Sequence, residues 1–356
     1  MERAAFAVTL KWCVSTAVFC ALTSVAATPS QRGKATPKWR TDLRSVLGGP
    51  PATAPNSLWF TDNKTIVATW VAREGAQGLR IPLVVLEADT GRVLAAPDLP
   101  GDVANAHVIV AHDGKFVLQA SGELTLYGSD LKPLKKVKLP PLAEADWAAY
   151  PSPSGRHVLF VPPMHRLGAW LWLDTDTLQI VQSWEDLRTG DVSVADGKIA
   201  RTTSASNVDV ADIGKEWKTI APGDRHLYVK FVAEDLLYVA ASPNRLLRPG
   251  GQIVFASDEP SVRCVWGIAY PSADGRRFVV PECAIKGAVP TLDIGGHPVL
   301  TGLYIHDGDS SAWSYALDVK GPAVKGLALG ALSPDGSHLA ILSGDSVELF
   351  ALPPVR

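Results

Sequence analysis

Short apolar runs separated by tight polar turns recur along the chain. The clearest copy spans Leu332–Leu342, where Pro334, Asp335 and Gly336 stand between two stretches rich in Leu, Ala and Ile. Proline pre-sets φ for an early turn position, aspartate hydrogen-bonds its own backbone, and glycine takes the positive φ that the turn needs. This pattern predicts two antiparallel strands joined by a hairpin turn.

Seven copies of this strand–turn–strand unit can be placed between residues 57 and 343. Their turns are Asp62-Asn63, Asp113-Gly114, Ser154-Gly155, Asp196-Gly197, Glu234-Asp235, Asp274-Gly275 and Asp335-Gly336. Successive turns are 51, 41, 42, 38, 40 and 61 residues apart, which leaves room for two more strands in each unit. A period near forty with four strands is typical of β-propeller blades, and the uneven last gap leaves six or eight blades open besides seven.

The last unit lacks a fourth strand, because the chain ends in Pro353-Pro354-Val355-Arg356 soon after its third. Thr41–Leu47 precedes the first unit and has no partner of its own. We expect this segment to complete the last blade, since such closure removes exposed sheet edges. The predicted fold class is therefore all-β. Residues 41–356 are expected to form a single seven-bladed propeller of four-stranded antiparallel blades, closed by an N-terminal strand and preceded by a flexible segment over residues 28–40.

The first 27 residues have the pattern of an export signal. Arg3 and Lys11 supply positive charge, residues 12–25 form an uncharged and mostly apolar run of fourteen, and Val25-Ala26-Ala27 offers small residues for cleavage after Ala27. An uncleaved membrane anchor is the other interpretation, but a bilayer span needs about twenty residues. We therefore expect a periplasmic or secreted protein with no membrane anchor after cleavage.

Cys264 and Cys283 are the two cysteines that remain after that cleavage. An even pair in an oxidising compartment favours a disulfide. If the hairpin turns between Ala273 and Asp274, residues whose numbers sum to 547 face each other across it. The numbers 264 and 283 sum to 547, so the two cysteines are expected to lie opposite each other. Two free buried thiols are the other interpretation, and a metal site has too few ligands here.

The turn sequence Ser333-Pro334-Asp335-Gly336, with its relatives Ser152-Pro153-Ser154-Gly155 and Ala273-Asp274-Gly275, resembles the repeat of bacterial WD40-like, YVTN-type β-propellers. That group also includes the propeller subunit of quinoprotein amine dehydrogenases. The resemblance covers about residues 57–352. It implies a propeller fold and assigns no catalytic residue.

One face of such a propeller is expected to carry the long loops. These are the predicted loops at residues 73–80, 162–168, 242–250 and 285–299, whereas the turns on the opposite face are short. Irregular loops on a rigid scaffold usually carry function. The candidate ligand-binding residues on this face are His165, Arg166, Arg245, Arg248 and His297. Arg245 and Arg248 could together bind a carboxylate or phosphate. Ordinary solvated loop charges are the other interpretation.

Local motifs exclude several classes of chemistry. The formal charge of −2 argues against a nucleic-acid binder. No His-x-His, His-Glu-x-x-His or Gly-x-Ser-x-Gly sequence occurs, so no metal, cofactor or catalytic residue is predicted.

The leading functional hypothesis is an exported, non-catalytic propeller, expected to be a monomer, that binds a protein, peptide or envelope glycan on its long-loop face. The alternative is a periplasmic propeller enzyme or redox subunit, lactonase-like or quinoprotein dehydrogenase-like, with a site at the mouth of the central channel. Whether the chain is an enzyme stays open, with the non-enzyme interpretation favoured.

Overall fold

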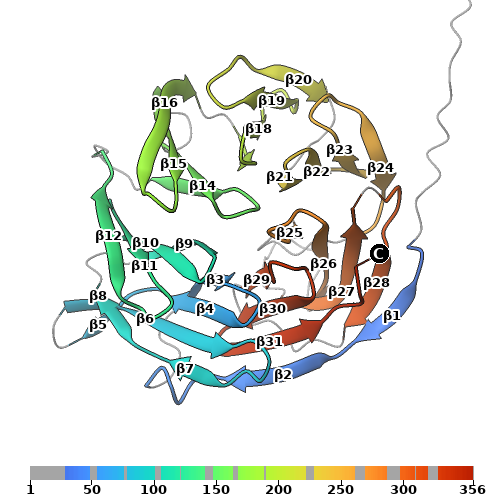
Figure 1. Cartoon of the computed structure of the whole chain (residues 1–356). Helices are drawn as coiled ribbons and strands as arrows, with labels where there is room; N and C mark the ends of the chain where they lie inside the picture. The colour runs from blue at the N-terminus through green and yellow to red at the C-terminus, as the bar shows by residue number, and fades with distance from the viewer. Residues whose placement is uncertain are drawn as a thin grey trace, which may run out of the picture.

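Seven antiparallel sheets surround a central axis (Figure 1). The computed structural model describes residues 29–48, 54–75, 78–100, 106–120, 122–140, 147–162, 167–187, 190–221, 228–260, 269–286, 297–308, 310–319 and 328–355. All regular elements there are strands, and none of these residues belongs to a helix that could cross a bilayer. The predicted all-β propeller with seven four-stranded blades is confirmed.

Each blade runs from an inner strand at the channel to an outer strand at the rim. Blade one consists of β3 (Pro55–Phe60), β4 (Thr65–Trp70), β6 (Gly78–Glu87) and β7 (Val93–Ala95). Blade two consists of β9 (His107–His112), β10 (Lys115–Ala120), β11 (Glu123–Tyr127) and β12 (Pro133–Lys138). Blade three consists of β13 (Ala148–Pro151), β14 (His157–Val161), β15 (Leu167–Asp174) and β16 (Gln179–Leu187). Blade four consists of β17 (Val192–Val194), β18 (Lys198–Thr202), β19 (Val208–Asp212) and β20 (Lys218–Ala221). Blade five consists of β21 (Tyr228–Ala233), β22 (Leu236–Ala240), β23 (Asn244–Leu247) and β24 (Ile253–Ser257).

The last two blades include strands from both ends of the described chain. Blade six consists of β25 (Tyr270–Pro271), β26 (Arg277–Lys286), β27 (His297–Asp307) and β28 (Tyr315–Val319), with β1 (Arg32–Ala35) added outside. Blade seven consists of β29 (Ala328–Leu332), β30 (His338–Ser343), β31 (Ser346–Ala351) and β2 (Pro37–Asp42). Two short strands, β5 (Arg73–Gly75) and β8 (Asp98–Pro100), extend blade one along β6.

Serine and glycine build the turn between the first and second strands in blades three, six and seven. In blade seven the Ser333 hydroxyl donates to Asp335 Oδ1 at 2.7 Å, the Gly336 N–H donates to the Ser333 carbonyl at 2.8 Å, and Gly336 has φ +70°. The same serine hydroxyl accepts the N–H of His338 at 2.9 Å, where the second strand begins. Side-chain hydrogen bonds of this kind satisfy backbone groups that the turn takes out of the ladder. Ser152 and Ser272 make the corresponding contacts to the N–H groups of His157 and Arg277 in blades three and six. All seven predicted turns are confirmed.

The hairpin that precedes Cys283 has a different register from the one we predicted. Pro271 pairs with Phe278, so the turn is centred between Asp274 and Gly275, one residue later than assumed. Direct opposition of the two cysteines therefore does not follow from this register. Cys283 is buried in β26, Cys264 lies outside the described residues, and their disulfide stays a prediction.

The N-terminal segment closes the ring, as expected, but with an earlier strand. Pro37–Asp42 pairs antiparallel with β31, whereas the prediction used Thr41–Leu47. Leu43 and Leu47 belong to a turn instead, in which the Leu47 N–H donates to the Leu43 carbonyl at 2.9 Å, and both side chains are buried. Their four-residue spacing fits one helical turn better than the two-residue period of a strand.

Residues ahead of position 41 are also paired, although the sequence suggested a flexible segment over residues 28–40. β1 runs parallel to β28, with Arg32 opposite Ala316, and the Ser30 N–H donates to the Trp313 carbonyl at 3.0 Å. The backbone of β1 thus pairs with the outer strand of blade six. The four residues of β1 are too few to show a strand pattern in the sequence.

The core lies between neighbouring blades. Each apolar cluster combines side chains from two adjacent sheets, for example Phe116 and Leu118 of blade two with Val67 and Leu83 of blade one. Trp70, Trp170 and Trp313 are almost completely buried. Large aromatic side chains fill the wedge between twisted sheets that fan out from an axis.

Candidate functional site

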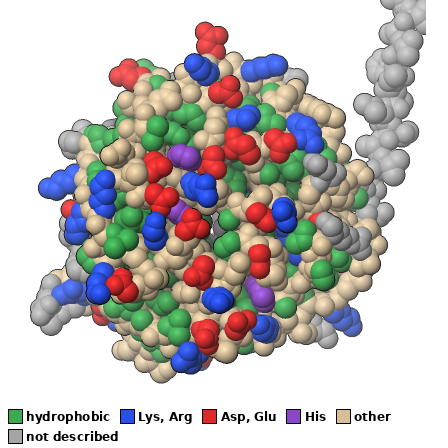
Figure 2. Space-filling model, in the orientation of Figure 1, with side chains coloured by type: hydrophobic (Ala, Val, Ile, Leu, Met, Phe, Trp, Pro, Cys, Tyr) green, Lys and Arg blue, Asp and Glu red, His purple; other side chains and the backbone are tan. Residues whose placement is uncertain are grey.

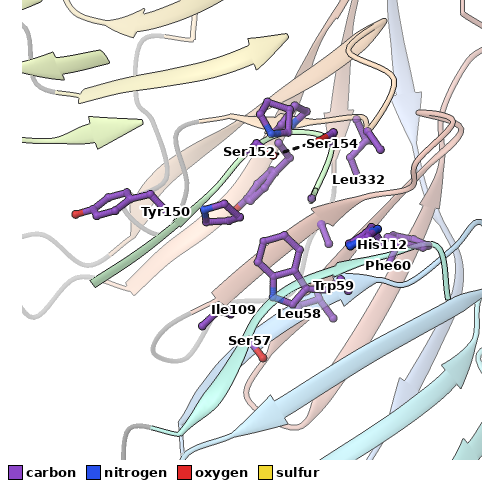
Figure 3. Close-up of a pocket in the computed structure, with 18 of the residues that line it drawn as sticks. Ser57, Leu58, Trp59, Phe60, Ile109, His112, Tyr150, Ser152, Ser154 and Leu332 are labelled. Atoms are coloured by element: carbon purple, nitrogen blue, oxygen red, sulfur yellow. Dashed lines mark hydrogen bonds between the residues drawn. The ribbon is translucent and has the colours of Figure 1, made fainter. Parts of the chain in front are cut away.

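The inner strands of all seven blades line a central cavity of about 760 Å³. Aromatic side chains on its wall include Trp59, Tyr150 and Tyr270. The Trp59 indole N–H donates to the Val108 carbonyl at 3.0 Å, which fixes its ring across β3 and β9. Figure 3 shows this part of the wall, with Trp59 between β9 and β13. The channel is therefore a preformed space with a partly aromatic lining.

Lys230 of β21 is the basic residue on an inner strand of this cavity. Burial lowers the pKa of its ammonium group, and the nearby Asp191 partly opposes that change. Asp191 itself accepts the Val229 N–H at 2.9 Å. Lys230 lines the cavity, and it makes no hydrogen bond or ion pair within the described ranges. Sequence reasoning missed it, although a single lysine within the otherwise apolar run of β21 was the available signal.

The face at the first-to-second-strand turns is held together by contacts between neighbouring blades. The Gly114 N–H donates to the Thr61 carbonyl at 2.8 Å, joining blades two and one. The Asp335 N–H donates to Asn63 Oδ1 at 3.1 Å, joining blades seven and one. The Asp196 N–H donates to Glu234 Oε2 at 2.7 Å, joining blades four and five. We call this side the turn face.

Asp196 is a carboxylate of the turn face that contacts a neighbouring blade. It accepts hydrogen bonds from Ser154 at 2.8 Å, and His157 Nδ1 lies 3.1 Å from the same oxygen. Burial alone would raise its pKa, but hydrogen bonds from His157 and the neighbouring serine hydroxyls outweigh burial and lower the pKa to about 2. The His157 ring stacks on Trp172 with centroids 5.0 Å apart. This arrangement joins blades three and four and has the features of a structural contact.

Charged side chains surround the channel opening, as a view along the axis shows (Figure 2). Among the described residues no group of three or more His, Cys, Asp or Glu side chains could hold a metal ion. We therefore assign no metal centre to these residues.

On the opposite face, which we call the loop face, strands of three blades extend beyond the inner strands. In blade six, β26 and β27 remain paired as far as Lys286 and His297, well beyond the last pair of β25 with β26 at Tyr270 and Val279. In blade three, β15 and β16 pair out to Leu167 and Leu187. In blade one, β5, β6 and β8 form a three-stranded extension that β3 does not reach.

The described ends of three predicted long loops, 73–80, 162–168 and 285–299, thus lie on the loop face. His297 begins β27 at the far end of the blade-six hairpin. His165 and Arg166 lie outside the described residues, directly before Leu167 of blade three. The fourth predicted loop is wrong. Residues 244–247 form β23, so the segment 242–250 contains a strand.

This strand separates Arg245 from Arg248. Arg245 is opposite Val239, near the loop face, whereas Arg248 follows the end of β23 that pairs with Leu237, next to the turn face. Arg248 forms an ion pair with Asp235 in the adjacent turn. Residues three apart along a strand also point to opposite sides of the sheet. The two arginines therefore do not grip one anion together as predicted, and only Arg245 stays a candidate for the loop face.

No family model matches the sequence, and no curated protein matches it. Among solved structures, a chain of the mitotic checkpoint complex is similar with a TM-score of 0.55 and 15% identity, over 99% of this chain and 100% of that one. Hsv2 of Kluyveromyces lactis is similar with a TM-score of 0.52 and 10% identity, over 83% and 91% of the two chains. The C-terminal WD40 domain of Sif2 has a TM-score of 0.50 and 9% identity, over 90% and 99%.

These similarities concern the fold, since every identity is low. The chain is an all-β propeller of seven four-stranded blades. More particularly, it has the fold of WD40 propellers. The finer resemblance to bacterial YVTN-type repeats stays a prediction from the turn sequences.

Proposed function

We propose that this protein is an exported, non-catalytic propeller scaffold that binds a protein, peptide or envelope glycan on its loop face. The observation that carries this proposal is the contrast between the two faces. Hydrogen bonds join neighbouring turns on the turn face, whereas strands of blades one, three and six extend beyond the inner strands on the loop face. Raised, irregular segments on a rigid scaffold are where binding residues usually lie.

The similar solved structures are consistent with a binding role, because one of them belongs to a protein complex. The candidate contact residues are Arg245, His165, Arg166 and His297, together with Leu167, which begins β15 and is 74% exposed.

A capture experiment with matched variants tests the proposal. The immobilised mature chain is incubated with periplasmic and culture-medium extracts, and bound material is identified by mass spectrometry and glycan analysis. Leu167→Glu alters the loop face, and Arg276→Glu alters a residue of the turn face whose side chain is 77% exposed. Loss of the partner with Leu167→Glu alone supports the loop face. Loss with Arg276→Glu alone moves the site to the turn face, and absence of any specific partner contradicts the proposed class.

Export is tested separately by fractionating cells that express the full chain. Sequencing the N-terminus of the exported protein should show that it begins at Thr28. An N-terminus at Met1 in the membrane fraction would contradict cleavage.

A further inference from the structure

Four residues that line the central cavity lie at one level of it, on the inner strands of four blades. They are Trp59, Tyr150, Lys230 and Tyr270, and Figure 3 shows the first two. Each is opposite the third residue of the second strand of its blade, namely Val67, Leu159, Tyr238 and Val279. The other three blades have Val110, Ser193 and Ala331 at this position. Blade five thus has a lysine where blades one, three and six have an aromatic residue.

Lys230 lies on the side of its strand that is turned to blade six. Its neighbours Val229 and Phe231 belong to an apolar cluster with residues of blade four. Adjacent residues of a strand point to opposite sides of the sheet, so Lys230 is on the other side. Tyr270 of blade six is likewise turned to the next blade, where a Cβ on Gly330 would lie 2.5 Å from its ring. The residues at this level therefore lean towards the inner strand of the following blade.

Blade six offers no counter-charge to this lysine. Residues 260–273, which include its inner strand β25, contain no aspartate or glutamate. Asp191 lies on the blade-four side, where it accepts the Val229 N–H, and it only partly opposes the lowering of the Lys230 pKa by burial. A buried cation without a partner is destabilising, whereas a bound anion would compensate its charge.

The other acidic residues of the described cavity lining lie at its turn-face end. They are Asp113, Asp196 and Asp274, which belong to the turns between first and second strands. Asp196 is held by the contacts described above, and Asp274 accepts the Ser272 hydroxyl at 2.7 Å. At least three strand residues, or about 10 Å, separate these turns from the level of Lys230. Their carboxylates therefore do not supply its counter-charge.

We propose that the central cavity binds a small organic carboxylate, whose charged group is held by Lys230 and whose apolar body contacts the aromatic residues at the same level. Charge complementarity favours an anion, since Lys230 is the charged residue at this level of the seven inner strands. The aromatic residues favour an apolar, planar body. A cavity of about 760 Å³ is of the usual size for a small-molecule site. The site uses none of the loop-face contact residues, so it is independent of the proposed scaffold function.

Calorimetric titration of the mature chain with naphthoate and with its uncharged isostere naphthamide tests the proposal. The wild type should bind naphthoate about tenfold more tightly, the effect of one charge-assisted hydrogen bond. Lys230→Met should remove this preference, and Lys230→Arg, which keeps the charge, should retain it. The matched control is Lys64→Met, at an exposed position in the blade-one turn, which should bind like the wild type. Equal affinities of the wild type for the two probes, or no binding of naphthoate, benzoate or indole acetate at millimolar concentration, would overturn the proposal.

Thermal unfolding distinguishes loss of the site from a misfolded variant. Lys230→Met removes a buried cation without a partner, so it should unfold at or above the wild-type temperature. Naphthoate should raise the unfolding temperature of the wild type and not that of Lys230→Met. It should also stabilise Leu167→Glu, because that variant alters only the loop face, and this result does not depend on whether the loop face binds a partner. A naphthoate-induced shift that Lys230→Met retains contradicts the proposed site.

Discussion

Arg277 and Asp307 form a buried bidentate ion pair between the second and third strands of blade six. Arg277 Nε lies 2.5 Å from Asp307 Oδ1, and Nη2 lies 2.9 Å from Oδ2. The guanidinium also donates to the carbonyls of Gly336, Pro353 and Pro354 at 3.0, 2.6 and 3.1 Å. One side chain thus joins blade six to the turn of blade seven and to the C-terminal segment.

Replacing Arg277 with alanine should lower the free energy of unfolding by about 3–5 kcal/mol, because Asp307 would be left buried without its counter-ion. Urea unfolding of the mature chain measures this loss. The neighbouring Arg276, with a side chain 77% exposed, is the control, and Arg276→Ala should change stability by less than about 0.5 kcal/mol. Equal losses in the two variants would show that the buried network is not what stabilises this region.

Gly91 tests the closure of the ring by β2. It has φ +72°, and a Cβ there would lie 2.6 Å from the Trp39 ring and 2.6 Å from Thr41 Oγ1. Gly122 has φ +71° and no atom within 4 Å of such a Cβ. Gly122→Ala should therefore cost about 1–2 kcal/mol from the left-handed backbone alone. Gly91→Ala should cost clearly more, because it also displaces β2.

Thermal unfolding of the two glycine variants side by side separates these two effects. Hydrogen exchange should in addition show faster exchange in β2 for Gly91→Ala and not for Gly122→Ala. Indistinguishable stabilities would mean that β2 adapts to the added methyl group without loss.

The sequence predicted those parts of the fold that local chemistry determines. Each blade turn depends on residues within five positions of one another, such as Ser333, Asp335, Gly336 and His338, and all seven turns were located correctly. The position of the closing strand was wrong by a few residues because Leu43 and Leu47 are buried as strand residues would be, yet they form a turn.

The site was harder to predict, because its residues meet through contacts between blades. The buried pair Leu246 and Leu247 marked β23, but the flanking Pro243 and Pro249-Gly250-Gly251 suggested a loop and brought Arg245 and Arg248 together wrongly. Arg277 follows a turn and would be expected in solvent. Its partners lie 30, 59, 76 and 77 residues further along the chain, so no local sequence pattern indicates that Arg277 is buried.

Asp196 should make stability depend on acid pH. Its folded pKa of about 2 lies below the ordinary value of 3.8, so its ionised form stabilises the fold above about pH 4, and this contribution is lost as pH falls towards 2. Asp196→Asn should therefore be less stable than the wild type at neutral pH, and the difference should shrink between about pH 4 and pH 2. Urea midpoints across this range measure it. Asp212→Asn, at an exposed position at the end of β19, is the matched control for the substitution itself. A difference that stays constant as the pH falls would contradict the assigned role of the carboxylate.

The predicted disulfide between Cys264 and Cys283 would close a loop of about twenty residues, for which chain entropy gives roughly 3 kcal/mol of stabilisation. Cys283 is only 2% exposed, so its thiol chemistry must be measured after unfolding. Thiol titration of the exported chain in denaturant should detect no free thiol without reductant and two after reduction. Reductant should also lower the urea midpoint of the wild type and leave that of the Cys264→Ser, Cys283→Ser double variant unchanged. Two titratable thiols before reduction would show that the cysteines are unpaired, and the stability of blade six would then rest on its hydrophobic packing and on the Arg277 network alone.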